Sequence, residues 1–310
     1  MDSRTILVTG ASGFVGSALC RQLNMLGVFS VRAPSRRDAE LAAETDWVSA
    51  LAGVDAVIHA AARVHVMQEN ANDSQAEFRR VNVDGTLNLA QQAAAAGVRR
   101  FIFISSIKVN GELSQPGQPL RADDTPAPQD AYGVSKHEAE QGLLQLAAAT
   151  GMEVVVIRPV LVYGPGVKAN FLSMLRWVQR GVPLPLGALP NRRSLVFVDN
   201  LVDLVMACLD HPQAANQVFL ASDGQDVTLS QLLRAIGQAL GRPARLLPVP
   251  PSLLHAAARV LGRGDLAQRL LGSLQVDITK NHQLLGWTPP FKLEQGLNLT
   301  ARAFLDAQNR

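Results

Sequence analysis

A tyrosine and a lysine lie four positions apart, at Tyr132 and Lys136, where a predicted helix over residues 135–149 begins. Side chains at this spacing share one face of a helix. A free phenol has a pKa of about 10, and a neighbouring ammonium group stabilises the phenolate and lowers that pKa. We therefore expect Tyr132 to exchange a proton with a substrate hydroxyl or a developing alkoxide, with Lys136 as its partner.

Two serines, Ser105 and Ser106, follow a predicted strand over residues 101–104. Ligands of parallel sheets bind beside the carboxyl ends of the strands, so a serine at this place can donate a hydrogen bond to a reacting oxygen. A tyrosine–lysine pair alone is usually a pair of surface side chains. Its combination with these serines and with a glycine-rich turn favours a catalytic site.

The glycine-rich turn carries Gly10, Gly13 and Gly16 and joins a predicted strand over residues 5–8 to a predicted helix over residues 15–26. Glycines permit a tight turn and a close approach of the backbone to a pyrophosphate, and the helix N-terminus adds unpaired N–H groups. The alternative is an ordinary strand-to-helix turn. The position directly after the first strand favours a dinucleotide site.

The end of the second predicted strand, residues 28–31, bears on the choice of cofactor. NAD sites commonly hold the ribose with an acidic residue, whereas a nearby arginine accommodates the 2′-phosphate of NADP. No acid occurs here before Asp38, while Arg32, Ser35 and Arg36 can bind a phosphate. The segment therefore favours NADP(H), with NAD(H) or a merely solvated basic loop as the alternatives.

The elements that must position these residues alternate along the first half of the chain. Short apolar strands separated by helices predict an α/β fold, a Rossmann-type doubly wound parallel sheet with helices on both faces. Residues 1–165 would form a dinucleotide-binding domain to which residues 195–222 return. Residues 166–194 and 223–310 would form a smaller, mostly helical C-terminal substrate-binding region. The other predicted elements are strands over residues 56–59 and 154–157 and helices over residues 81–96, 200–209, 229–240 and 253–261.

The composition excludes several classes of protein. The chain has 310 residues, 47% of them apolar and 18% charged, as in ordinary globular proteins. The formal net charge is only +3, without a run of lysines or arginines, so no nucleic-acid partner is expected. No apolar stretch is long enough to span a membrane, and no signal peptide is recognised. Cys20 and Cys208 have no metal-ligand spacing, so we expect no metal and a reducing, cytoplasmic location.

Motifs along nearly the whole chain resemble those of the extended short-chain dehydrogenase/reductases, in the NAD(P)-dependent nucleotide-sugar epimerase/dehydratase group. The combination is specific for the family and less specific for the reaction. Besides the features above, the matching segments are His59-Ala60-Ala61-Ala62, Asn82-Val83-Asp84-Gly85-Thr86, Arg158-Pro159, Tyr163-Gly164-Pro165-Gly166 and Leu285-Gly286-Trp287-Thr288-Pro289.

The resemblance implies roles for individual residues. Ser106, five residues before Gly111, matches the family's catalytic serine or threonine, beside Tyr132 and Lys136. Arg193 matches a diphosphate-binding arginine, for which a surface ion pair is the alternative. The implied cofactor contacts are Gly10, Ser12, Gly13, Phe14, Val15, Gly16, Ala60, Ala61, Asn82, Lys136, Pro159 and Val160, and the implied substrate contacts are Ser106, Asn170, Phe171, Arg193 and, by a looser match, Arg269.

The resemblance further implies hydride transfer at C4 of a UDP-linked hexose or N-acetylhexose. The segment with Lys108 and Asn110 is similar to enzymes of bacterial surface-polysaccharide and lipopolysaccharide synthesis. The leading hypothesis is a 4-keto-6-deoxy sugar reductase that exchanges NADPH. The alternatives are a UDP-glucose or UDP-N-acetylglucosamine 4-epimerase with tightly held NAD, and a non-catalytic dinucleotide sensor or scaffold. The helices over residues 81–96 and 135–149 would form the interface of a homodimer.

Overall fold

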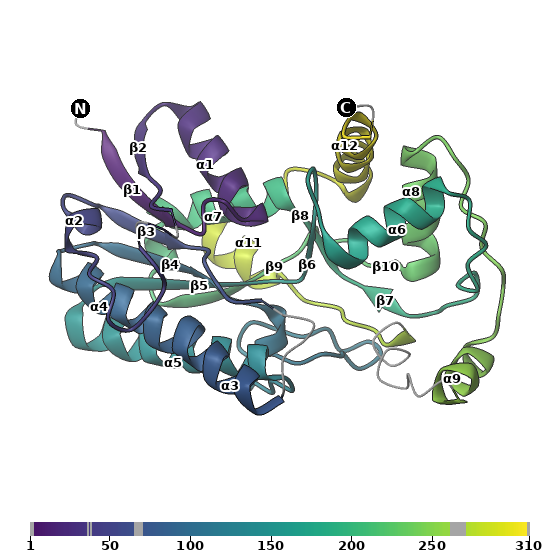
Figure 1. Ribbon diagram of the computed structural model, residues 1–310, viewed down its shortest axis with the longest axis horizontal. Coiled ribbons are helices and arrows are strands. Elements are labelled where there is room, and N and C mark those ends of the chain that lie inside the picture. The colour runs from purple at the N-terminus through teal and green to yellow at the C-terminus, as the bar shows by residue number, and fades with distance from the viewer. Residues whose placement is uncertain (1–2, 36, 38, 65–70, 261–270, 309–310) are drawn as a thin grey trace.

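The computed structural model describes residues 3–35, 37, 39–64, 71–260 and 271–308. In this part of the chain a six-stranded parallel sheet has the order β2-β1-β3-β4-β5-β9 (Figure 1). The order reverses at β1 and β3, and parallel sheets of this class bind ligands at such a reversal. The predicted Rossmann-type fold is therefore confirmed. The strands are β1 (Arg4–Thr9), β2 (Phe29–Arg32), β3 (Ala56–His59), β4 (Arg100–Ile104), β5 (Glu153–Pro159) and β9 (Gln217–Ala221).

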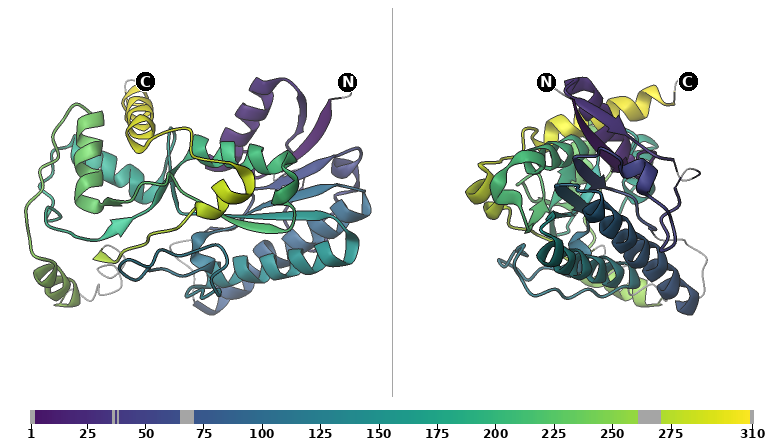
Figure 2. Two further views of the ribbon diagram at one scale, coloured as in Figure 1. Left: turned by 180° about the vertical axis from the view of Figure 1, so that it is seen from behind. Right: turned by 90° about the vertical axis from the view of Figure 1, so that its left-hand side faces the viewer.

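Helices cover both faces of this sheet, as Figures 1 and 2 show. Side chains alternate along β1, so Ile6 and Val8 belong to the same core cluster as Leu19 of the first helix, whereas Leu7 belongs to the opposite cluster with Leu143. One face carries α1 (Phe14–Leu26), α7 (Val198–Asp210) and α11 (Thr279–Leu285), and the other carries α2 (Val48–Leu51), α3 (Ala71–Arg79), α4 (Thr86–Ala95) and α5 (Ala131–Thr150).

The helix predicted over residues 81–96 differs from the observed structure. Helix α3 precedes it, and residues Arg80–Gly85 form a π-helical turn, η1, before α4 begins. Gly85 lies against the backbone of Leu41 and Ala42, where an added Cβ would come within 2.8 Å. A π turn interrupts the period of 3.6 residues, so the spacing of apolar residues does not indicate it. Such turns are frequent at functional sites.

The C-terminal part of the chain combines short strand pairs with helices. Strand β9 pairs with β5 in the main sheet, so part of residues 195–222 lies in that sheet. The division of the chain into two domains stays a prediction. The pairs are β6 (Leu161–Tyr163) with β8 (Leu195–Phe197) and β7 (Arg192–Arg193) with β10 (Val227–Thr228), and the helices are α6 (Ala169–Gln179), α8 (Leu229–Ala239), α9 (Pro251–Val260) and α12 (Leu293–Asp306).

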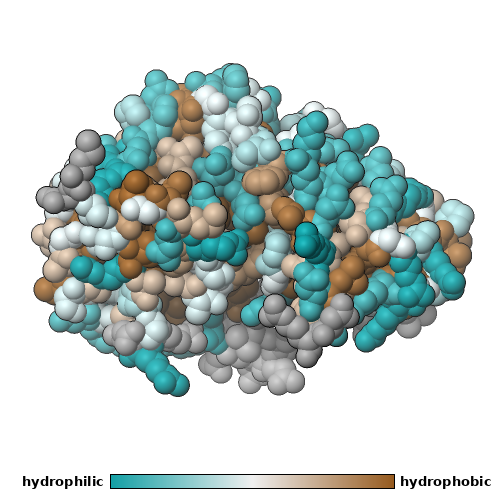
Figure 3. Space-filling model, turned by 90° about the horizontal axis from the view of Figure 1, so that it is seen from above, coloured by the Kyte–Doolittle hydropathy of each residue, from teal (hydrophilic) through white to brown (hydrophobic). Residues whose placement is uncertain are grey.

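The surface seen from above alternates between hydrophilic and hydrophobic residues (Figure 3). The exposed apolar side chains of the described chain include Met25, Leu26 and Val28 around the end of α1. Among the described residues, the structure contains no helix with the length and apolar character that a membrane span requires.

Candidate active site

The glycine-rich turn joins β1 to α1, as the sequence predicts, and lies against the residues that follow β3. Gly10 has a φ of 70°, and an added Cβ would lie 2.6 Å from the Ala61 nitrogen. An added Cβ on Gly16 would lie 2.1 Å from the Gly10 carbonyl oxygen. Helix α1 begins after Gly13 without a side-chain cap and without an acidic residue in its first turn. The N–H groups of this uncapped N-terminus, together with the glycine backbone before it, can bind an anionic group such as a pyrophosphate.

The first testable consequence concerns Gly10. Replacing it by alanine should destabilise the protein by about 1–3 kcal/mol, because the new Cβ meets backbone at a positive φ. It should also weaken dinucleotide binding, since the turn must shift away from Ala60 and Ala61. Urea unfolding and NADH titration measure the two effects. Gly27→Ala is the matched control: its φ is 67°, and an added Cβ meets nothing within 4 Å. If both variants lost the same stability and the same affinity for NADH, contact with the backbone of Ala60 and Ala61 would not be the reason why position 10 needs glycine.

The ends of β1 and β3 are held together by a buried histidine. His59 is fully buried, and its Nδ1 lies 2.6 Å from Thr9 Oγ1 while its Nε2 lies 2.9 Å from Thr86 Oγ1. Burial, with a smaller contribution from the charge of Lys136, lowers the pKa of His59 to about 3. The imidazole therefore stays neutral and acts as a structural bridge between β1, β3 and α4. Neither threonine was predicted as a partner of this histidine, although Thr86 ends a matched segment and Thr9 directly precedes Gly10.

Asn82 lies in the π turn and braces the loop that follows β3. Its Oδ1 accepts from the backbone nitrogen of Arg63 (2.8 Å), and its Nδ2 donates to the Arg63 carbonyl (3.1 Å) and to Ser135 Oγ (3.0 Å). Ser135 Oγ in turn donates to the Tyr132 carbonyl (2.8 Å). The side chain is thus fixed between the strand end and the helix with Tyr132. Its contact with a cofactor stays a prediction.

The structure brings Ser106, Tyr132 and Lys136 onto two elements that pack on each other. Ser106 lies two residues after the end of β4 and is the N-cap of η2 (Ile107–Val109), where its Oγ accepts from the Lys108 nitrogen at 3.3 Å. Tyr132 is partly buried in the first turn of α5, and Lys136 lies one turn further along, almost fully buried. Lys136 Nζ donates to the Ile104 carbonyl (2.8 Å) at the end of β4.

The expected effect of Lys136 on the phenol is not what the structure shows. Burial, together with the charge of Asp130, raises the pKa of Tyr132 to about 12, whereas we expected a lowered pKa. Burial lowers the pKa of Lys136 to about 7, although the charge of Glu140 opposes this shift. The physical reason is desolvation, which disfavours phenolate and ammonium alike.

The structure describes two of the three residues at and after the end of β2 that were expected to bind a phosphate, Arg32 and Ser35. Arg32 Nη1 donates to the carbonyls of Ala50 (2.7 Å) and Ala52 (2.9 Å) at the end of α2, which holds this part of the guanidinium on the protein. Ser35 is exposed, and its Oγ accepts from the Arg37 nitrogen (3.3 Å). Arg36 lies outside the described residues. The structure therefore provides less support for NADP(H) than the sequence suggested.

The structure shows the positions of three of the residues that were expected to contact the substrate. Phe171 is 1% exposed and stacks on Tyr163 at 5.3 Å between ring centroids, so its side chain belongs to the core, contrary to the expectation. Asn170 precedes it in the first turn of α6 and is exposed. Arg193 lies in β7, and burial lowers the pKa of its guanidinium. Arg269 lies outside the described residues.

The other residues expected at the cofactor are placed around the same strand ends. Ser12 is exposed in the turn, while Phe14 and Val15 open α1 and pack against the main core. Pro159 ends β5, and Val160 follows it, buried, with its nitrogen bonded to the Ala221 carbonyl (3.2 Å). Their contacts with a dinucleotide stay predictions.

The model of the NAD dependent epimerase/dehydratase family matches residues 6–221, more than two thirds of the chain. The chain belongs to this family. Among its relatives, a UDP-glucose 4-epimerase of Vibrio cholerae is 47% identical, with 99% of this chain and 97% of the relative covered. A GDP-6-deoxy-D-mannose reductase of Pseudomonas aeruginosa is 28% identical, with 95% of each chain covered.

Solved structures agree with this membership. RMD from Pseudomonas aeruginosa complexed with NADPH has a TM-score of 0.77 and 25% identity, covering 97% of this chain and 99% of that one. MoeE5 in complex with UDP-glucose and NAD has a TM-score of 0.78 and 26% identity, covering 98% and 99%. Structural neighbours of this family member thus bind NAD or NADPH.

A buried network in this family member was missed by the sequence analysis. Glu140, one turn after Lys136, accepts from Arg158 Nε at its Oε1 (3.0 Å) and from Arg158 Nη2 at its Oε2 (2.5 Å). Ser105 Oγ also donates to Glu140 Oε1, and Arg158 Nη1 donates to Asn110 Oδ1 (2.9 Å). The network ties α5 to the residue before Ser106. Arg158 was matched as a motif residue, but nothing in the spacing indicated its partner.

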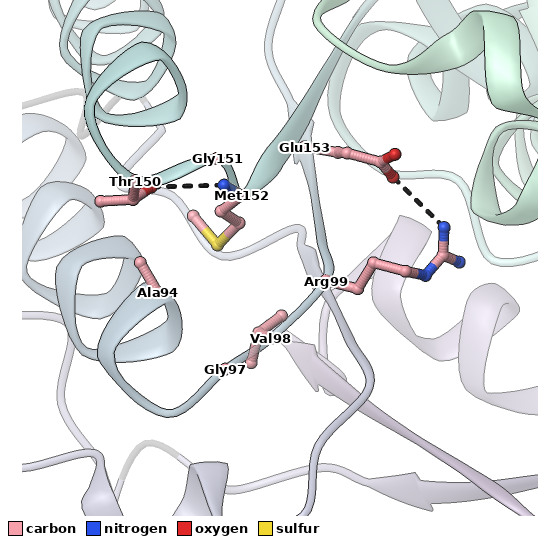
Figure 4. A pocket seen from close by; sticks show the side chains of 8 residues that line it. All are labelled: Ala94, Gly97, Val98, Arg99, Thr150, Gly151, Met152 and Glu153. Atoms are coloured by element: carbon pink, nitrogen blue, oxygen red, sulfur yellow. Dashed lines mark hydrogen bonds and ion pairs between the residues drawn. The ribbon is translucent and has the colours of Figure 1, made fainter.

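The cavity drawn in Figure 4 is not part of this site. It has a volume of about 370 Å³ and lies at the amino ends of β4 and β5, whereas ligands of such sheets bind at the carboxyl ends. Its lining consists of Ala94, Gly97, Val98, Arg99, Thr150, Gly151, Met152 and Glu153.

Proposed function

We propose that this chain is a UDP-hexose 4-epimerase that interconverts UDP-glucose and UDP-galactose with retained NAD. The observation that carries the proposal is the 47% identity, over nearly the full length of both chains, to the Vibrio cholerae UDP-glucose 4-epimerase. The chain is an enzyme of the nucleotide-sugar epimerase and reductase type. Within that type the epimerase, which was the alternative at the level of the sequence, is favoured over the 4-keto-6-deoxy sugar reductase.

The residues of the strand ends fit a dinucleotide. An added Cβ on Gly10 or Gly16 would collide with the backbone of Ala60 and Ala61 or of Gly10, so only glycines keep the turn between β1 and α1 tight and its backbone open to a pyrophosphate. In the proposal, the turn with Gly10, Gly13 and Gly16 holds the pyrophosphate, and Asn82 keeps the adjoining loop in place. When bound, NAD supplies the acceptor and then the donor of the hydride at C4. Arg32 is held at α2, so we propose NAD rather than NADP.

The acid–base work falls to three residues of this chain. Tyr132 Oη removes the proton of the C4 hydroxyl when the 4-keto sugar forms and returns it when the alcohol is restored. Ser106 Oγ donates a hydrogen bond to the same oxygen and stabilises the charge that develops there. Lys136, one helical turn from Tyr132, supplies a hydrogen-bond donor and, in its protonated form, positive charge that favours the phenolate. On the substrate side, Arg193 binds the diphosphate, and Asn170 stands exposed at the start of α6.

The purified protein tests the proposal directly. We expect mass spectrometry to find co-purifying NAD(H), and we expect UDP-galactose to form from UDP-glucose without added cofactor. An epimerase must retain its reduced cofactor between the two half-reactions, whereas a reductase must exchange it. A protein that is purified without dinucleotide and consumes one NADPH for each 4-keto sugar would instead be a reductase. Absence of affinity for both dinucleotides would contradict the enzymatic proposal.

We also propose a homodimer in which α4 and α5 of each subunit form the interface. The two helices pack side by side within the subunit, where an added Cβ on Gly142 would lie 2.6 Å from the Leu87 side chain. Gln91 and Gln145 are exposed on the outer sides of these helices. Light scattering at several concentrations would distinguish a dimer from a monomer. The role in surface-polysaccharide synthesis and the cytoplasmic location remain expectations.

A further inference from the structure

Lys108 and Asp130 form an ion pair between the two elements that carry Ser106 and Tyr132. Lys108 lies in η2, and its Nζ contacts Asp130 Oδ2 and lies 3.8 Å from Glu112 Oε1. Asp130 is the N-cap of α5, and its Oδ1 accepts from the Gly133 nitrogen at 2.7 Å. One carboxylate thus holds the lysine with one oxygen and the first turn of the helix with the other.

The backbones of η2 and of the first turn of α5 also lie in close contact. A Cβ added to Gly133 would lie 2.9 Å from the Lys108 carbonyl oxygen and 3.2 Å from Asp130 Oδ1. The Lys108 nitrogen meanwhile donates to Ser106 Oγ. The side chains of Lys108 and Asp130 are 29% and 16% exposed, so solvent and salt screen this pair less than a surface pair.

We propose that the Lys108–Asp130 pair positions the catalytic groups, because it fastens the turn with Ser106 to the helix turn with Tyr132 and balances the charge of Asp130 beside the phenol. The inference rests on the proposed acid–base role of Tyr132. Lys108 and Asp130 are positioning residues in it, since they act through Ser106 and Tyr132 and not on the substrate.

The electrostatic part follows from the charges around Tyr132. The negative charge of Asp130 raises the pKa of the Tyr132 phenol. The ammonium group of Lys108, which pairs with Asp130, must reduce this effect. From α3 the uncharged ring of Phe78 faces Tyr132 at 6.1 Å between centroids. The other charged or titratable residues on the elements packed around this turn are Lys136, His137, Glu138 and Glu140 on α5, Glu112 after η2, and Asp73, Glu77, Arg79, Arg80 and Asp84 on α3 and η1. Of these, Glu77 pairs with Arg80, and Arg79 pairs with Glu138.

The proposal predicts opposite effects for the two partners. Lys108→Met leaves the charge of Asp130 unbalanced, so the pKa of Tyr132 should rise by about one unit. Asp130→Asn removes that charge and keeps an N-cap side chain, so the pKa should fall by a similar amount. Because the phenolate is the base, the acidic limb of kcat against pH should move to higher pH in Lys108→Met and to lower pH in Asp130→Asn.

The phenol can be followed without any assay of activity. The chain has two tyrosines, and burial raises the pKa of Tyr163 far above the ordinary range. Carbon-13 labelling of the phenol carbons therefore gives two NMR signals, and only that of Tyr132 should begin to titrate as the pH rises. A Tyr132→Phe sample assigns it. This measurement distinguishes a failure of the inference from a failure of the proposed epimerase, because it needs no substrate.

Kinetics test the positioning part. In Lys108→Met we expect kcat to fall about tenfold with little change in KM, since a small misplacement of Ser106 against Tyr132 slows the chemical step. Lys108→Arg, which restores the ion pair, should recover most of this loss. Lys280→Met is the control, because it removes a lysine that pairs with an exposed carboxylate, Asp123 (2.6 Å), and neither residue belongs to the proposed site. Unchanged titration of Tyr132 in both Lys108→Met and Asp130→Asn would overturn the proposal; if Lys108→Met does not fold, Asp130→Asn decides.

Discussion

Replacing Tyr132 by phenylalanine should lower kcat by about 10²–10⁴-fold, the range by which a positioned acid–base group accelerates a reaction. The phenol is the one titratable group of the proposed trio whose proton must reach the C4 oxygen in both half-reactions. Phenylalanine keeps the ring and therefore its edge contact with Phe78 (6.1 Å between centroids). Folding and NAD binding should consequently be retained, while the interconversion of UDP-glucose and UDP-galactose is lost.

The second tyrosine provides the control for this experiment. Tyr163→Phe also removes a phenol oxygen, which donates to Asp223 Oδ2 at 2.9 Å in the core. It should reduce stability without changing kcat of the folded protein, because Asp223 retains its bonds from the Phe197 nitrogen and Asn200 Nδ2. If Tyr132→Phe still turned over UDP-glucose at the rate of the unchanged protein, Tyr132 would not be the acid–base group.

The sequence predicted the sheet because the sheet depends on local signals, and the same signals carry the prediction of the site. Apolar runs of β-branched residues indicate strands, and the glycines of the first turn are required by contacts within that turn and with the end of β3. The carboxyl ends of parallel strands meet at one edge, so residues placed after three different strands had to converge. The serines were identified in this way, whereas the tyrosine and the lysine were identified by their spacing on one helix face.

The sequence did not indicate contacts whose partner lies far away in the chain. Arg32 was expected to face a phosphate, but its guanidinium meets carbonyls that are 18 and 20 residues further along. Phe171 lies in a motif expected at the substrate, yet it packs in the core on a tyrosine from another element. The sign of the Tyr132 pKa shift depends on how deeply the phenol is buried, and sequence spacing contains no information on burial.

The second large effect is expected for stability, at Glu140. Glu140→Gln should reduce the free energy of unfolding by about 3–5 kcal/mol, because the guanidinium of Arg158 would remain buried without its counter-charge. Both side chains are less than 5% exposed, so water does not replace the lost carboxylate. Urea unfolding of the variant, followed by circular dichroism, measures the change. Activity should fall as well, since one amide oxygen replaces the carboxylate that accepts from both Ser105 and Arg158 beside Ser106.

The same helix provides a matched control. Glu138, two residues earlier on α5, pairs with Arg79 at 3.4 Å, with side chains 34% and 64% exposed. Glu138→Gln should therefore change stability by less than about 1 kcal/mol. A double variant, Glu140→Leu with Arg158→Leu, should be more stable than Glu140→Gln, because it removes both charges at once. Equal losses in the two glutamine variants would show that burial does not govern this pair, and the network could then not be what holds α5 against the serines of the site.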